Sequence, residues 1–363
     1  MSAGSRLAFL AGGFFIFAPT GLLGDLSSLG GNSFSRLMAS VAFSGGIAVA
    51  YLVAIRRPRW VPAVIALQLI ITLQFDRWFG AVGPGLSGPA LRDRMLADVN
   101  AATVSIIVSF ILFASVLRLE GTRYARARTE IALARDIHRL LVPQVSKRIN
   151  GFEFRGLSVP SGDVGGDLVD LVDNAGGWTA FVVDVSGHGV GSGLLMGVIK
   201  SSARTELRHG GGLERLLNTL NAVVFELKDP RMFATFAGLH FEGGSTLQFA
   251  VAGHLPILHY SAATSTLEEL TTPQVAVAMF DDRQFSASTI SWSPGDLFVI
   301  VTDGITEVFD GQDREFGFEQ VKSIIRSSAG EPLEVIEHRL MAAARAHGAQ
   351  LDDQTLLLVR ALG

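Results

Sequence analysis

The sequence predicts an α+β domain preceded by a four-helix transmembrane region. Four stretches without a charged residue lie within residues 1–120. In residues 121–363, short β-rich runs are bunched into hairpins and helical patterns are grouped apart, which favours α+β layers over an alternating parallel sheet. The charge balance changes between the same two parts, from nine basic and five acidic residues to 21 and 29.

The composition excludes several classes of protein. The 363 residues contain no cysteine, which excludes a disulfide framework, a cysteine-ligated metal site and a thiol nucleophile. Charged residues make up 18% and apolar residues 48%, so the chain is neither disordered nor collagen-like. The net charge of −4 gives no polyanion-binding signature, and we expect no nucleic-acid partner.

The uncharged stretches are long enough to cross a lipid bilayer. They cover residues 7–24, 37–55, 60–75 and 99–117. A membrane helix needs about 20 mostly apolar residues. The third stretch is short, but Trp60 and Trp78 lie at its two ends, where indoles anchor a span at the headgroups, so we extend it through Arg77. One buried soluble helix could explain a single stretch but not four, and we predict a membrane domain over residues 1–120.

Arginines predict the orientation of these spans. The loop at 56–59 and the segment 118–128 are basic, whereas the other two loops mix charges. The positive-inside rule therefore places both termini in the cytoplasm. A cleaved signal peptide is an alternative reading of residues 1–24, but the apolar run is longer than usual and no clear cleavage site follows.

Residues 121–146 are predicted to form an amphipathic connector helix that ends at Pro143. One apolar stripe, at i, i+4, i+7 and i+8, is made by Leu133, Ile137, Leu140 and Leu141. The stripe covers barely two heptads, so two alternatives stay open: packing on the chain's own domain, or pairing in a homodimer that transmits a signal. The arginine-rich first half could also rest on anionic headgroups.

The remaining residues, 147–363, show alternating or continuous apolar runs typical of strands. The predicted strands are 152–159, 179–185, 233–241, 246–252, 297–301 and 355–359. Residues 242–245 are short enough to join two of them in an antiparallel hairpin. The predicted helices are 190–208, 213–227, 318–327 and 333–347.

Aspartates lie beside several strand ends. Asp184 and Asp303 end apolar strands, Asp167 follows two glycines, and Asp352 and Asp353 precede the last strand. Carboxylates gathered at a sheet edge repel one another unless cations neutralise them, and an all-oxygen set suits Mg²⁺ or Mn²⁺. Each aspartate alone is more often a turn residue that caps its own backbone. The combination therefore predicts a metal site.

Seven motifs occur in the order found in a known family. They are Gly-Gly-Asp-Leu-Val-Asp, Asp-Val-Ser-Gly-His-Gly, Met-Phe-Ala-Thr-Phe, Ala-Gly-His-Leu-Pro, Pro-Gly-Asp, Thr-Asp-Gly-Ile-Thr-Glu and Asp-Asp-Gln-Thr. Over about residues 130–360 the chain resembles the sporulation-protein-E-like (SpoIIE, RsbU-type) branch of the bacterial PPM/PP2C serine/threonine phosphatases. The helix before the domain is also similar, with His138 where glutamine is common. The resemblance implies a PP2C-like αββα sandwich, two antiparallel sheets flanked by helices.

The resemblance also implies a centre of two Mn²⁺ or Mg²⁺ ions. Asp184 matches the carboxylate that bridges both ions, and Val185 would offer its backbone carbonyl. The other implied ligands are Asp167, Asp303 and Asp352. Asp353 matches a neighbour that supports the ligands. Asp184 and Asp167 are the residues on which we expect catalysis to depend.

Two positions depart from the family pattern. Val169 replaces an aromatic residue, and residues 272–279 replace a loop that bears glycine and proline. His188 is read as a structural residue rather than a general acid, and His254 as shaping the sheet end rather than binding metal. The helices at 190–227 are candidates to move and complete the metal site.

The resulting expectation is a membrane-anchored, metal-dependent protein serine/threonine phosphatase of a bacterial inner membrane, with a cytoplasmic catalytic domain. A metal-activated water would be the nucleophile. The resemblance implies a phosphorylated anti-anti-sigma-type substrate. The alternative is a catalytically weak or inactive membrane receptor that keeps the fold and binds a regulator. A transporter with a regulatory tail is disfavoured, because the spans contain almost no ionisable residues.

Overall fold

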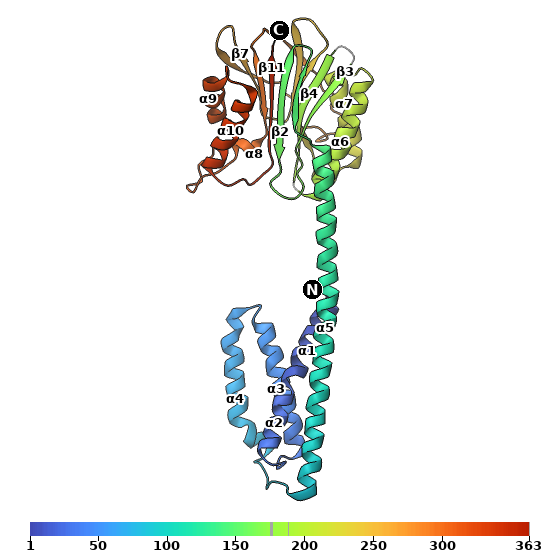
Figure 1. The fold of residues 1–363 in the computed structure, drawn as a ribbon, viewed down its shortest axis with the longest axis vertical. Coiled ribbons are helices and arrows are strands. Elements are labelled where there is room, and N and C mark those ends of the chain that lie inside the picture. Colours follow the sequence, from blue (N-terminus) through green and yellow to red (C-terminus); the bar gives the residue numbers. More distant parts are fainter. Residues whose placement is uncertain (175–176, 188, 363) are drawn as a thin grey trace. The chain divides into compact units, whose positions relative to one another are not determined.

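The computed structural model describes residues 1–174, 177–187 and 189–362, and the chain divides into two compact units (Figure 1). The first unit is Met1–Arg128 and the second is Thr129–Gly363. Helix α5 (Gly88–Leu141) contributes to both. The connector predicted for residues 121–146 is helical only through Leu141, because Val145 and Ser146 pair with a neighbouring strand.

The regular elements of the first unit are all helices. Its elements are α1 (Ala3–Phe17), α2 (Pro19–Ser27), α3 (Phe34–Ala54), the short 3-10 turn η1 (Pro58–Trp60), α4 (Val61–Phe79) and the first part of α5. Four helical segments are long and apolar enough to cross a membrane: Ala3–Ser27, Phe34–Ala54, Pro58–Phe79 and Gly88–Leu141. The first comprises α1 and α2, which are separate because Pro19 has no N–H to continue the α1 ladder.

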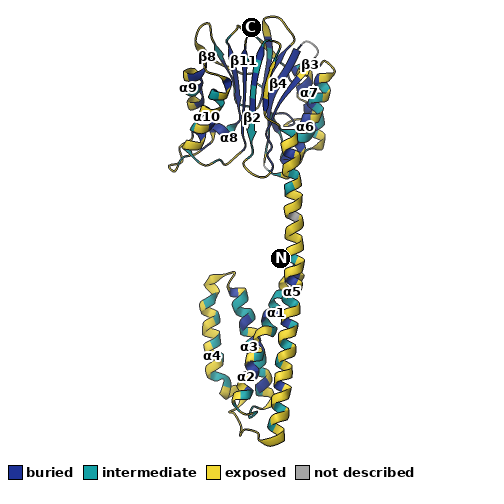
Figure 2. Ribbon diagram, viewed as in Figure 1, coloured by how far each residue is buried: buried dark blue, intermediate teal, exposed yellow. Residues whose placement is uncertain are grey.

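Glycines bring helices of this unit close together. A Cβ on Gly45 of α3 would lie 2.5 Å from the ring of Phe14, and one on Gly21 of α2 would lie 2.5 Å from the backbone of Ser40. Such close approach is typical of helices packed in lipid. By contrast, α4 buries no residue, and Figure 2 shows its largely exposed surface.

The second unit contains two antiparallel sheets. One has the order β1-β2-β11-β10-β7-β8 and the other β3-β4-β5-β6-β9. The strands of the first are β1 (Val145–Ile149), β2 (Phe152–Val159), β7 (Ile257–Ser261), β8 (Thr266–Leu270), β10 (Leu297–Val301) and β11 (Gln354–Ala361). Those of the second are β3 (Leu168–Asn174), β4 (Gly177–Val185), β5 (Ala234–Phe241), β6 (Thr246–Ala252) and β9 (Ser288–Ser291). The predicted β5–β6 hairpin is confirmed by antiparallel pairing.

Helices cover the outer faces of both sheets (Figure 1). α6 (Val190–Arg208) and α7 (Leu213–Leu227) share a core with β3–β6, whereas α9 (Phe318–Ser328) and α10 (Leu333–His347) share one with β10 and β11. The short α8 (Asp303–Thr306) follows β10. Between the sheets, Trp178 packs edge-to-face on Phe152 and Phe154. The predicted αββα sandwich is confirmed.

Candidate metal centre

Strand pairing places the predicted aspartates at matching sheet ends. Leu168, the first residue of β3, pairs with Val183, so Asp167 lies beside Asp184 in one sheet. In the other sheet, Val301 at the end of β10 pairs with Leu356 near the start of β11. Asp303 and the Asp352–Asp353 pair therefore emerge from the same end of that sheet.

A threonine joins the two sheets at this edge. Thr302 Oγ1 donates a 2.9 Å hydrogen bond to Asp167 Oδ2, and it accepts a 3.0 Å bond from the backbone N–H of Thr355. Asp167 is 2% exposed and Thr302 is also buried. The hydroxyl of Thr302 thus fixes one carboxylate oxygen of Asp167 against the β10–β11 end of the opposite sheet.

Asp353 anchors the loop that leads to Asp167. Its Oδ1 accepts bonds from the N–H of Ser161, at 2.7 Å, and from the Ser161 hydroxyl, at 3.1 Å. Its Oδ2 accepts a 2.7 Å bond from the N–H of Gly166. Both carboxylate oxygens are therefore occupied inside the fold, which matches a supporting residue better than a ligand.

The two glycines before Asp167 are required by close packing. A Cβ on Gly165 would lie 2.3 Å from Asp353 Oδ2, and one on Gly166 would lie 2.7 Å from the carbonyl oxygen of Val185. Real Cβ atoms do not approach so closely. Only glycine lets this loop approach both the Asp353 anchor and the Val185 carbonyl.

The electrostatics show how strongly these carboxylates interact. Burial, together with the charges of Asp303, Asp352 and Asp353, raises the pKa of Asp184 to about 7, against the opposing effect of a hydrogen bond with Asp167. Burial, and then the charges of Asp184 and Asp353, raise the pKa of Asp167 well above its usual range. Both shifts run in the direction expected where buried carboxylates lie close together, and a positive charge nearby would oppose them.

The aspartates at this sheet edge do not form a closed metal cage. Among the described residues, no three histidine, aspartate or glutamate side chains stand close enough together to enclose an ion. Exposure rises across the set, from the buried Asp167, through the half-buried Asp184 and Asp303, to the exposed Asp352. The edge is therefore open to solvent on the side of Asp352.

One acidic residue at this edge was not singled out from the sequence. Burial raises the pKa of Glu307, and the charges of Asp303, Glu315 and Asp352 add to this. Its backbone N–H donates a 2.6 Å bond to the carbonyl oxygen of Asp303. The spacing i, i+4 across the short α8 could have indicated that the two carboxylates lie near each other.

Three histidines considered in the sequence analysis, at positions 138, 188 and 254, differ in their surroundings. His188 lies outside the described residues. Burial lowers the pKa of His254 to about 4, so its ring is neutral. His138 of α5 is buried, and its Nε2 has no hydrogen-bond partner among the described residues. Burial lowers the pKa of His138, and the negative charge of Asp353 opposes this.

Residues 174–362 match the family model described as Stage II sporulation protein E (SpoIIE). Phosphoserine phosphatase RsbU of Bacillus subtilis is 25% identical over 181 residues, which cover 50% of this chain and 54% of that protein. Phosphoserine phosphatase RsbP of the same organism is 24% identical over 241 residues, covering 64% of this chain and 58% of the other. The chain thus spans about half the length of the curated relatives it matches.

Solved structures confirm the fold of the second unit. The PP2C domain of SiaA from Pseudomonas aeruginosa matches with a TM-score of 0.56 and 19% identity, covering 66% of this chain and 98% of that domain. The RsbU and RsbW domains of a Mycobacterium tuberculosis protein match with a TM-score of 0.54 and 20% identity, covering 61% and 62%. At these identities the likeness concerns the fold alone.

Proposed function

The chain belongs to the SpoIIE family, and from that premise we propose that it is a metal-dependent protein serine/threonine phosphatase anchored in a membrane. The observation that carries the proposal is geometric: carboxylates from the ends of two sheets meet at one edge, where Thr302 Oγ1 donates a hydrogen bond to Asp167 Oδ2. Buried like charges are costly unless cations compensate them. All the groups on offer are oxygens, the ligands that Mg²⁺ and Mn²⁺ prefer.

Each residue has a distinct part in this proposal. Two ions would be held by the carboxylates of Asp184, Asp167, Asp303 and Asp352 and by the backbone carbonyl of Val185, with Asp184 as the ligand on which both depend. Bound Mn²⁺ or Mg²⁺ would supply an acidified water and neutralise phosphate charge. Thr302 and Asp353 hold the Asp167 carboxylate and its loop in place through the hydrogen bonds described above.

The names of the relatives support the proposed substrate class. RsbU and RsbP are named phosphoserine phosphatases. We extend that activity to this chain and propose phosphoserine or phosphothreonine of a regulatory protein, of the anti-anti-sigma type, as the group hydrolysed.

The activity is tested with the full chain, a phosphoserine peptide and added Mn²⁺. The proposal expects phosphate release that chelation abolishes and that Asp184→Asn lowers by at least about 10²-fold. Asp173→Asn is the matched control, because Asp173 is an exposed carboxylate at the far end of the same β3–β4 pair. Release that survives both chelation and Asp184→Asn would contradict the proposal, and regulator binding without turnover would favour the receptor alternative.

The membrane part is proposed to be multi-pass, with the catalytic unit in the cytoplasm of a bacterial cell. The four apolar helices and the basic loop at residues 56–59 support this. The cysteine-free chain allows single cysteines to be labelled without background. In intact cells, an impermeant maleimide should label Gly83→Cys and spare Arg57→Cys, and the reverse pattern would overturn the orientation.

The connector is proposed to pair with a second copy of the chain. Leu140 is 81% exposed and Leu133 is 61% exposed, whereas Leu141 packs on the core of its own domain. One leucine of the predicted apolar stripe therefore packs on the chain's own domain, whereas two others are free to pair with a second helix. Disulfide crosslinking through Leu140→Cys should link two chains in membranes, while Ile131→Cys, at an exposed position on the opposite face of the same helix, should not. Equal crosslinking at both positions would argue against a defined helix pair.

A further inference from the structure

A pocket opens between α3 and α4 in the first unit. Its walls are apolar and come from Ala50 and Val53 of α3 and Val64 of α4. Its rim carries Arg56, Arg57 and Trp60 from the connection between the two helices. The volume is about 680 Å³, inside the range of about 300–1,000 Å³ that ligand pockets occupy.

The arginines at the rim have no acidic partner. Residues 26–75 contain no aspartate or glutamate, so neither wall of the pocket supplies one. Among the ion pairs of the described residues, none involves Arg56 or Arg57. Among the described residues, the side-chain hydrogen bond of Arg56 runs from Nη2 to the sulfur of Met1, at 3.8 Å.

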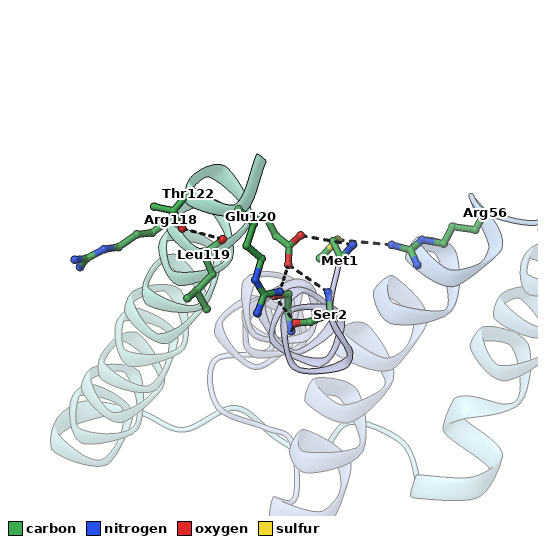
Figure 3. A network of polar contacts seen from close by, with 9 residues as sticks. Met1, Ser2, Arg56, Arg118, Leu119, Glu120 and Thr122 are labelled. Carbon is green, nitrogen blue, oxygen red and sulfur yellow. Dashed lines mark hydrogen bonds and ion pairs between the residues drawn. The ribbon is translucent and has the colours of Figure 1, made fainter. Parts of the chain in front are cut away.

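The acidic residue at this end of the unit is engaged elsewhere. Figure 3 shows Met1 between Glu120 and Arg56, with Glu120 in contact with Met1 and Ser2; the Met1 ammonium lies 3.5 Å from Glu120 Oε2. Glu120 Oε1 accepts a 3.3 Å bond from the N–H of Ser2 and a 3.2 Å bond from Arg123 Nη1. The four other acidic residues of the unit, at 25, 76, 93 and 98, lie at or beyond the opposite ends of the spans. The rim of the pocket therefore keeps an uncompensated positive charge.

We propose that this pocket binds one anionic phospholipid. An acyl chain would lie along Ala50, Val53 and Val64, and the phosphate would meet Arg56 and Arg57. Trp60 lines the pocket beside these arginines, and indole side chains favour the headgroup region of a bilayer. Basic pockets between membrane helices are a recurring way to bind anionic headgroups. The site is separate from the proposed phosphatase chemistry and does not depend on it.

The apolar walls and the basic rim of the pocket together argue against two other occupants, free phosphate and a second copy of the chain. A free phosphate would make no use of the apolar walls. A second copy of the chain, docking with α3 or most of α4, would bring no carboxylate within residues 26–75 to meet the arginines. A phospholipid of negative charge satisfies both the walls and the rim.

The test uses the full chain in phosphatidylcholine vesicles that contain a low, equal fraction of either dibromo-phosphatidylglycerol or dibromo-phosphatidylcholine. Bromine on the acyl chains quenches tryptophan on contact. Trp60 and Trp78 lie near opposite ends of the Pro58–Phe79 segment, so Trp60→Phe and Trp78→Phe variants separate their two signals within one helix. We expect the phosphatidylglycerol probe to quench Trp60 with an apparent affinity about tenfold above the phosphatidylcholine probe, and to show no such preference at Trp78.

Charge variants locate the headgroup. Arg56→Gln with Arg57→Gln should remove the preference at Trp60, whereas Arg77→Gln with Arg92→Gln, two exposed arginines away from the pocket, should keep it. Equal quenching of Trp60 by the two lipids, or an equal preference at Trp78, would overturn the proposal. Dimerisation that shields Trp60 from both lipids would do the same. If the double variant fails to insert, the comparison of Trp60 with Trp78 in the unmodified pocket still decides.

Discussion

The backbone N–H of Gly166 donates a 2.7 Å hydrogen bond to Oδ2 of Asp353, across 187 residues of sequence. This contact joins the loop before β3 in one sheet to the start of β11 in the other. Because Asp167 follows Gly166 directly, the position of a carboxylate that we propose as a metal ligand depends on Asp353. The contact therefore links the stability of the sheet edge to the proposed metal site.

Replacing Asp353 tests this dependence. Asp353→Ala leaves the N–H groups of Ser161 and Gly166 without an acceptor, which should cost about 1–3 kcal/mol of stability. Asp353→Asn keeps one carbonyl oxygen and should cost less. Hydrogen exchange of segment 161–167, together with the affinity for Mn²⁺, measures both effects. Unchanged exchange in Asp353→Ala would show that the loop holds its position without the anchor.

Adding one methyl group to the glycine pair should have a large local effect. Gly166→Ala would place a Cβ 2.7 Å from the Val185 carbonyl oxygen, so the loop or the end of β4 has to shift. Overpacking of this kind costs about 1–3 kcal/mol. Gly162→Ala in the same loop meets nothing within 4 Å and is the matched control. We expect Mn²⁺-dependent phosphate release to fall strongly in the first variant and to persist in the second; equal activities would count against the close contact.

The connector should be docked more weakly in acid. Burial lowers the pKa of His138, although the charge of Asp353 opposes this. A histidine whose folded-state pKa is lowered contributes stability above its ordinary pKa, about 6.5, and loses it as the pH falls below that value. Hydrogen exchange of residues 129–141, corrected for intrinsic rates, should therefore accelerate from about pH 7.5 to about pH 5.5. His138→Gln should remove this acceleration, and an identical pH response in the variant would assign it to other groups.

Much of the second unit could be predicted from sequence because its central elements carry strong local patterns. The strand at 152–159 and the helices at 190–208, 213–227 and 333–347 agree with β2, α6, α7 and α10. The structure adds β1, β3, β7, β8 and β9. In β3 the charged Asp170 breaks the apolar pattern, and only the fold supplies its partners, Arg204 at 2.7 Å and Lys200 at 3.2 Å.

The sequence indicates the carboxylates that we propose as ligands and the supporting Asp353, but it does not indicate the supporting residues Thr302 and Ser161. Asp167, Asp184, Asp303 and Asp352 stand beside strand ends or glycine turns, which the sequence shows directly. Thr302 and Ser161 act through partners 135 and 192 residues away, and no local pattern reports such contacts. The pairing of the two sheets brings these residues together.

Calorimetric titration of the full chain with Mn²⁺ tests the central claim most directly, since that claim is that the carboxylate edge holds metal. The carboxyl groups whose pKa is raised should release protons as ions bind, so the heat should depend on the ionisation enthalpy of the buffer. We predict two ions per chain for the unmodified protein and loss of both in Asp184→Asn, with Asp173→Asn unchanged. Binding of the same two ions by Asp184→Asn, or no binding by the unmodified chain, would contradict the account.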